Sequence, residues 1–187
     1  MSNISKMLSG GDLRSDGMAN EVVRLVRENP FMVDELIVAM TAEDNVIRGR
    51  SADVMEKLTR VHPEFAQSRL DLIIRLALND TVPMVRWHAA MILTNLLAME
   101  TNINKIYHGL IATLDDPSAI VKCWAISGVC YLGRKWSSRK KKILHRLTKL
   151  ESDSSIAVRH RAGAAIKVLI NDRLPMPAGW IKNYLKG

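Results

Sequence analysis

One short pattern recurs four times along the chain, and its spacing limits the fold more than any other feature. Each copy begins with a β-branched apolar residue followed by a base, and reaches a leucine eleven residues later. The copies begin at Ile47, Val85, Val121 and Val158, so they lie 38, 36 and 37 residues apart. Because another apolar segment and a short polar turn precede each copy, the repeated unit is a helical hairpin of about 37 residues.

Helical periodicity also governs the segments between these copies. Apolar residues recur at the spacing i, i+3, i+4, i+7, as in Leu70, Ile73, Ile74 and Ala77, and no segment alternates with a period of two. A chain of 187 residues is long enough for one domain with a substantial core. The sequence therefore predicts an all-α fold, an α-solenoid of antiparallel helical hairpins.

Aspartates in the turns give the repeats a more specific signature. Three turn aspartates precede the base of the second helix by six residues, in the pairs Asp80 with Arg86, Asp116 with Lys122, and Asp153 with Arg159. This pattern resembles the HEAT-repeat family over about Asn29 to Asp172. The resemblance implies that these side chains form a ladder between stacked repeats. The first repeat departs from the pattern, because Asp44 and Arg48 are four residues apart; its rung is expected to be missing or differently shaped.

The resemblance and the breaks between apolar segments divide the chain into units. We expect a mobile N-terminal tail over 1–17, which is rich in Ser and Gly, and a capping helix over 18–29. Four HEAT-like repeats follow, and a last capping helix comes after the prolines near residue 175. The repeats are expected at 30–60, 63–99, 102–134 and 138–172, and the C-terminal capping helix at 177–186.

A helical wheel separates two faces on each second helix. Counted from the β-branched residue, positions 0, 4, 7, 8 and 11 are mostly apolar and are expected to form the core. The opposite face is expected to line the concave side of a HEAT-like stack and to form a binding groove. Its candidate residues are Arg50, Asp53, Trp87, His88, Met91, Trp124, Tyr131 and Arg161. The alternative for Trp87 and Trp124 is that they tilt into the seams between repeats and simply pack.

The charge of the chain is concentrated in one segment. Eight bases and no acids lie between positions 134 and 149, whereas the other 19 bases balance the 19 acids, so this segment accounts for the net charge of +8. The patch is a candidate site for phosphate, nucleic acid or an acidic protein surface; the alternative is a solvated face that maintains solubility. Its residues are Arg134, Lys135, Arg139, Lys140, Lys141, Lys142, Arg146 and Lys149.

Reactive or metal-binding motifs are not found in the sequence. Two cysteines, Cys123 and Cys130, make neither a disulfide framework nor a zinc site, which favours a reducing cytoplasm. No signal-like segment opens the chain and no run of about 18 apolar residues predicts a membrane span. Nucleophile elbows, phosphate-binding loops and zinc-binding helices are likewise absent from the sequence, so neither a metal nor a cofactor is expected.

These observations predict a non-catalytic scaffold whose concave groove binds a protein or peptide. A nucleic-acid or other polyanion binder that uses the basic patch is the alternative. A third hypothesis is a DNA glycosylase of the alkylation-repair type, because HEAT-like enzymes of that kind use an Asp among Trp and Arg side chains. Asp53 is the one acid expected on the groove face, and the catalytic motif of those enzymes does not match residue by residue. The identity of the partner and the oligomeric state are left open.

Overall fold

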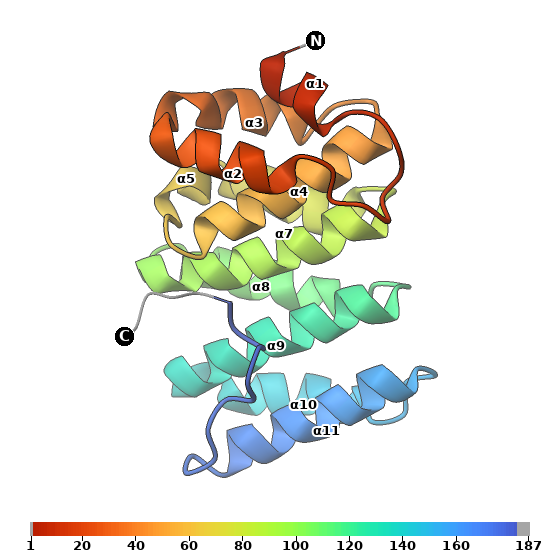
Figure 1. The fold of residues 1–187 in the computed structure, drawn as a ribbon. Helices are drawn as coiled ribbons and strands as arrows, with labels where there is room; N and C mark the ends of the chain where they lie inside the picture. Colours follow the sequence, from red (N-terminus) through yellow and green to blue (C-terminus); the bar gives the residue numbers. More distant parts are fainter. Residues whose placement is uncertain (1, 183–187) are drawn as a thin grey trace.

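The computed structural model describes residues 2–182, and this part of the chain is a stack of antiparallel helix pairs without strands (Figure 1). The prediction of an all-α solenoid is confirmed. The four pairs are α3 (Val33–Ala39) with α4 (Asn45–Thr59), α6 (Leu70–Asn79) with α7 (Pro83–Leu96), α8 (Ile103–Thr113) with α9 (Ala119–Lys135), and α10 (Lys140–Leu150) with α11 (Ile156–Ile170).

Shorter elements complete the stack. Two helices, α1 (Asn3–Leu8) and α2 (Ala19–Glu28), precede the first pair, and α5 (Glu64–Gln67) lies before α6. Three single turns of 3₁₀ helix join longer elements: η1 (Pro30–Met32), η2 (Leu97–Met99) and η3 (Ser137–Arg139).

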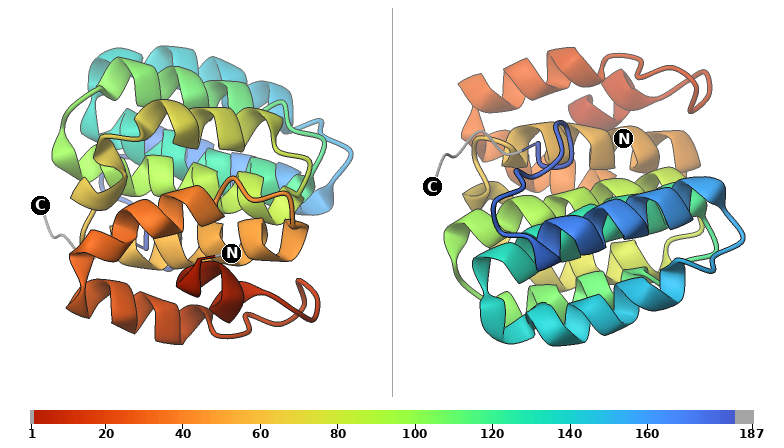
Figure 2. Two further views of the ribbon diagram at one scale, coloured as in Figure 1. Left: turned by 90° about the horizontal axis from the view of Figure 1, so that it is seen from above. Right: turned by 90° about the horizontal axis from the view of Figure 1, so that it is seen from below.

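The helices form two layers. In one layer α4, α7, α9 and α11 pack on one another in order, and the other layer contains the first helix of each pair (Figures 1 and 2). We call the side of the α4, α7, α9 and α11 layer that is turned away from the first helices the inner face. Any protein segment that contacts several repeats at once can do so along this face.

The repeated apolar positions fill the space between the layers. In α4 the five core positions of the wheel are at most 2% exposed: Ile47, Ser51, Val54, Met55 and Leu58. Packing is close enough to explain a glycine in the middle of α9, because a Cβ at Gly128 would collide with Oγ1 of Thr94 on α7. The absence of a side chain there lets neighbouring repeats approach.

A ladder of ion pairs joins consecutive repeats at the start of the second helices. Nε of Arg86 lies 2.6 Å from Oδ2 of Asp116 in the next repeat, and Nη2 lies 3.1 Å from Oδ1. Nη1 of the same guanidinium donates to the carbonyl of Asp80, six residues earlier in its own turn, at 2.8 Å. The six-residue spacing thus lets one arginine hold its own turn and the next repeat together. Lys122 makes the following rung to Asp153.

The two ends of the ladder differ from the sequence expectation. The first rung is present, because Arg48 pairs with Asp80 at 3.0 Å and donates through Nη1 to the carbonyl of Ala42, also six residues earlier. Asp44 instead accepts hydrogen bonds from two N–H groups at the start of its own helix. At the other end, Arg159 holds the carbonyl of Asp153, and no acid among the described residues pairs with it.

The N-terminal tail over 1–17 was expected to be mobile, but the structure contains a packed helix, α1, within it. Ile4 and Leu8 of α1 are fully buried, and the N–H of Ile4 donates to Oε1 of Glu35 at 2.7 Å. The spacing of four between these two apolar residues places both on one helical face, which explains why so short a helix can dock. The expected capping helix over 18–29 corresponds to α2.

The C-terminal end also differs from the expectation. No helix occurs over 177–182, and residues 183–186 of the expected capping helix lie outside the described residues. The chain leaves α11 after Ile170 and runs back across the inner face (Figure 1). Gly179 has φ 76°, in the left-handed region, and so interrupts a right-handed helix in this segment.

Candidate functional site

Residues 171–182, the C-terminal segment, cover part of the inner face over α9 and α11. Arg134 at the end of α9 holds the beginning of this segment and donates through Nη1 to the carbonyl of Leu174 at 2.7 Å and through Nη2 to that of Asp172 at 3.0 Å. Farther along, Sδ of Met176 lies 3.9 Å from Sγ of Cys130, and Trp180 is 9% exposed. The segment is therefore docked through both its backbone and its side chains.

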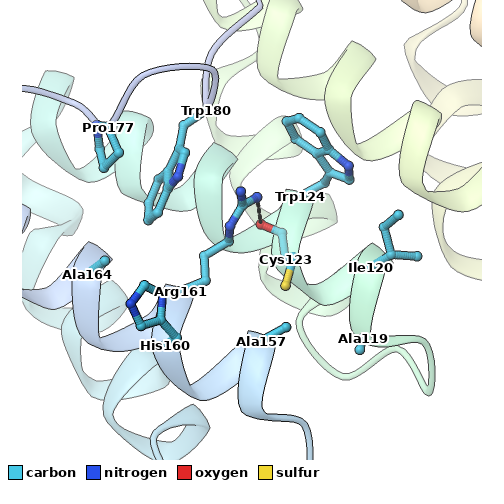
Figure 3. Close-up of a pocket in the computed structure, with 10 residues that line it drawn as sticks. All are labelled: Ala119, Ile120, Cys123, Trp124, Ala157, His160, Arg161, Ala164, Pro177 and Trp180. Atoms are coloured by element: carbon cyan, nitrogen blue, oxygen red, sulfur yellow. Dashed lines mark hydrogen bonds between the residues drawn. The ribbon is translucent and has the colours of Figure 1, made fainter.

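A cavity of about 790 Å³ lies between α9, α11 and the C-terminal segment (Figure 3). Its walls are mostly small apolar residues and indole rings, with one arginine and one histidine. The lining residues are Ala119, Ile120, Cys123, Trp124, Ala157, His160, Arg161, Ala164, Pro177 and Trp180. Ile120 is an apolar side chain that is 44% exposed at this cavity.

Arg161 is the charged centre of the cavity. Its guanidinium carbon lies 5.4 Å from the ring centre of Trp124 and 4.9 Å from that of Trp180, so an indole from each wall contacts the cation (Figure 3). Nη1 donates to the carbonyl of Cys123 and to Oγ of Ser127, both at 3.1 Å. These contacts fix the plane of the guanidinium. Within residues 2–182, Nε and Nη2 have no hydrogen-bond partner.

The electrostatics of the cavity are positive. Among the described residues that line the cavity there is no carboxylate, and Nζ of Lys182 adds a second cation 6.0 Å from the Trp124 ring centre. Burial lowers the pKa of the Arg161 guanidinium, although an arginine remains charged at neutral pH. Burial also raises the pKa of the Cys123 thiol, so this side chain is a protonated thiol at neutral pH.

Two of the eight predicted groove residues line this cavity, Trp124 and Arg161. Trp87 and Tyr131 are half-buried and lie outside it. Trp124 packs against the core as well as lining the cavity, so its two alternative roles coincide.

Arg50 does not lie open on the inner face as predicted, because it is 3% exposed. Its guanidinium donates to five backbone carbonyls, one at the last residue of α1 and four in the segment that follows. Nη1 contacts those of Leu8, Ser9 and Gly10, Nη2 that of Asp12, and Nε that of Ser15. Arg50 therefore stabilises the fold of the N-terminal residues rather than lining an open groove.

Asp53, His88 and Met91 also differ from the prediction, since each is at most 8% exposed. Oδ2 of Asp53 accepts from Lys57 at 2.8 Å, and its Oδ1 lies 3.5 Å from Nε2 of His88. Burial lowers the pKa of His88, so the imidazole is neutral at physiological pH. The N-terminal half of the inner face is thus a packed polar cluster rather than an open groove.

Acidic neighbours pair with much of the basic patch. Lys135 lies 2.7 Å from Glu100, Lys140 lies 2.9 Å from Asp172, and Arg146 lies 2.7 Å from Asp115. Arg139 donates to the side chain of Asn104, and Arg134 holds the C-terminal segment. The other three patch residues, Lys141, Lys142 and Lys149, are exposed. The sequence concentrates these bases, but the fold brings acids from other parts of the chain to them.

Several cavity residues were not among the predicted groove residues. Trp180 and Pro177 come from the expected capping helix, and Ile120 precedes the first repeat position of α9. A tryptophan in a stretch rich in Pro and Gly was the available signal, because a large aromatic side chain favours docking over solvent exposure.

Within residues 2–182, no group of three or more His, Cys, Asp or Glu side chains is placed to hold a metal ion. None of the helices in that range is long and apolar enough to cross a membrane.

Comparisons with known proteins identify the fold. No protein-family model and no curated protein matches the chain. Among solved structures, a chain in the complex of CpcE and CpcF of phycocyanin lyase from Nostoc sp. PCC7120 is similar with a TM-score of 0.67 and 23% identity, over 87% of this chain and 95% of that one. A computationally designed armadillo repeat protein for modular peptide recognition is similar with a TM-score of 0.65 and 18% identity, over 88% of this chain and 79% of that one. The chain therefore has the fold of helical-repeat proteins.

Proposed function

We propose that this chain is a non-catalytic HEAT-like scaffold protein that binds a segment of a partner protein on its inner face. The observation that carries the proposal is the cavity of about 790 Å³ between α9, α11 and the C-terminal segment. Binding sites typically have volumes of this size, a mostly apolar lining and a few fixed polar groups. The cavity around Arg161 has all three properties.

The composition of the cavity supports a protein ligand. Tryptophan and arginine dominate the binding energy of protein interfaces, because they offer a large contact area together with directional hydrogen bonds. Trp124 is fixed against the core, so little side-chain freedom would be lost on binding. Ile120 extends the apolar surface at the edge of the cavity.

The similar structures support the same class of function. The designed armadillo protein was made for peptide recognition, and the phycocyanin lyase chain comes from a complex of two proteins. Stacked helical repeats present extended surfaces for such partners. We extend this role to the present chain, whose inner face has a hollow of suitable size.

Two side chains bear on the non-catalytic part of the proposal. The raised pKa of Cys123 makes this cavity residue a poor nucleophile at neutral pH. Asp53, the residue of the glycosylase hypothesis, pairs with Lys57 away from the cavity. Both cysteines are free, which supports a reducing compartment such as the cytoplasm.

Capture experiments with matched variants test the proposal. Ile120→Asn makes the edge of the cavity polar at an exposed position, and should reduce partner capture from a native lysate without changing thermal stability. Ile170→Asn is the control, because Ile170 is 70% exposed and lies outside the cavity. Equal capture by the wild type and both variants would contradict the proposed site. A nuclease-treated lysate in parallel would reveal a nucleic-acid partner.

A further inference from the structure

Arg161 leaves three of its five N–H donors without a partner among residues 2–182, inside an apolar cavity. Nη1 is occupied by the Cys123 carbonyl and the Ser127 hydroxyl, whereas Nε and Nη2 have no partner among residues 2–182. A guanidinium presents Nε and Nη2 on one edge, which matches the two oxygens of a carboxylate. The open edge is therefore of the kind that binds an acid.

The ladder of this same protein contains the completed form of that arrangement. Nη1 of Arg86 holds a backbone carbonyl, while its Nε and Nη2 hold the two oxygens of Asp116. Arg48 divides its donors in the same way between the Ala42 carbonyl and Asp80. Arg161 repeats the carbonyl half of the arrangement without an acid on the other half.

Charge and environment point to the same ligand. The lining residues include no acid, and Lys182 adds a second positive charge at the Trp124 ring. Loss of water around a half-buried cation is unfavourable unless a counter-charge replaces it. The small apolar walls formed by Ala119, Ala157 and Ala164 leave room for an apolar side chain next to that counter-charge.

We propose that the cavity binds a protein segment in which a carboxylate lies beside an apolar side chain, and that the Nε and Nη2 edge of Arg161 selects the carboxylate. This inference rests on the proposed function and adds the chemistry of the partner. The carboxylate can belong to an acidic side chain or to the C-terminus of the partner chain. His160 stands beside Arg161 at the wall of the cavity.

Titration of defined peptides, followed by NMR, tests the inference. One amidated peptide contains an internal glutamate next to leucine, a second has glutamine in place of the glutamate, and a third ends in leucine with a free carboxylate. The indole N–H signals of Trp124 and Trp180 and the Nε–H signal of Arg161 report binding at the cavity. We expect the affinity of each acidic peptide to be higher than that of the glutamine peptide by a factor of about ten or more. The tighter of the two acidic peptides identifies the source of the carboxylate.

Two variants separate selection from structural support. Arg161→Gln should abolish the preference for acid over amide, whereas Lys167→Gln, which removes an exposed cation of α11 outside the cavity, should preserve it. The Trp180 indole signal shows whether the C-terminal segment remains docked in Arg161→Gln; if it has moved, Arg161→Lys, which keeps the charge without the fork, should lose most of the preference. Equal affinity for glutamate and glutamine peptides would overturn the inference and leave the docking site intact. If no peptide shifts either indole signal, the carboxylate inference is wrong, and the capture experiment with Ile120→Asn decides the proposed function separately.

Discussion

Replacing Asp116 with alanine removes the acid from a buried rung of the ladder. The side chains of Arg86 and Asp116 are 10% and 5% exposed and lie 2.6 Å apart, so the substitution leaves a buried guanidinium without its counter-charge. Breaking a buried ion pair in this way costs about 3–5 kcal/mol. Asp116 also accepts from the N–H of Ser118 at 2.7 Å, and loss of this hydrogen bond within the turn adds about 1 kcal/mol. We expect the free energy of unfolding to fall by about 4–6 kcal/mol in total.

The adjacent residue is a matched control. Asp115 also pairs with an arginine, Arg146, but the two side chains are 69% and 30% exposed. An exposed pair contributes about 0–1 kcal/mol, so Asp115→Ala should be close to neutral. Asp116→Asn keeps an acceptor for Ser118 and loses the charge, and should fall between the two alanine variants.

Urea unfolding followed by circular dichroism measures these differences. The midpoint and the slope of each transition are compared, because a change in slope would show that the repeats no longer unfold together. The reasoning would be refuted if the losses of unfolding free energy in Asp116→Ala and Asp115→Ala differed by less than about 0.5 kcal/mol. The ladder would then be a surface feature without a stabilising role.

Three further predictions follow from individual side chains. The hydrogen bond from Lys122 lowers the pKa of Asp153, so the contribution of this carboxylate to stability is present above about pH 4 and is lost as pH falls through the lowered pKa. The difference in unfolding free energy between wild type and Asp153→Asn should therefore shrink over that range. A difference that stays constant with pH would contradict this prediction. Arg134→Ala removes the donors that hold the C-terminal segment, so acrylamide should quench Trp180 fluorescence more strongly, and unchanged quenching would show that other contacts dock the segment. Burial raises the pKa of Cys130 to about 12, so the native protein at pH 8 should show no thiol reaction at this residue until denaturant is added; rapid labelling of Cys130 in the native state would contradict its burial.

Local patterns in the sequence predicted the features that depend on neighbouring residues along the chain. The spacing of the β-branched residues placed the second helices, because a helix repeats its faces every few residues. The position of Asp116 six residues before Lys122 carried the resemblance to HEAT repeats, and that resemblance implied a ladder between repeats. The fold class and the buried face of α4 therefore needed no information from distant parts of the chain.

Contacts between distant segments account for what the sequence did not predict. Arg50 lies on the polar side of its helix, yet residues 8–15 fold back over its side chain and bury it. These residues are 35 to 42 positions away in the sequence. In the same way the C-terminal segment brings Trp180 to Arg161. The spacing of Ile4 and Leu8 could have indicated a docked helix, but the Ser and Gly content around it favoured a mobile tail. A helical wheel ranks positions within one helix and contains no information on which segment covers them.

Photo-crosslinking from single positions tests the proposed docking site most directly. A photoreactive phenylalanine analogue is placed at 120, beside the cavity, or at 170, an exposed position outside it. We predict that the partner protein is captured from position 120 and not from position 170, and that its crosslinked segment contains a carboxylate next to an apolar residue. Equal capture from both positions, or capture from 170 alone, would contradict a docking site around Arg161.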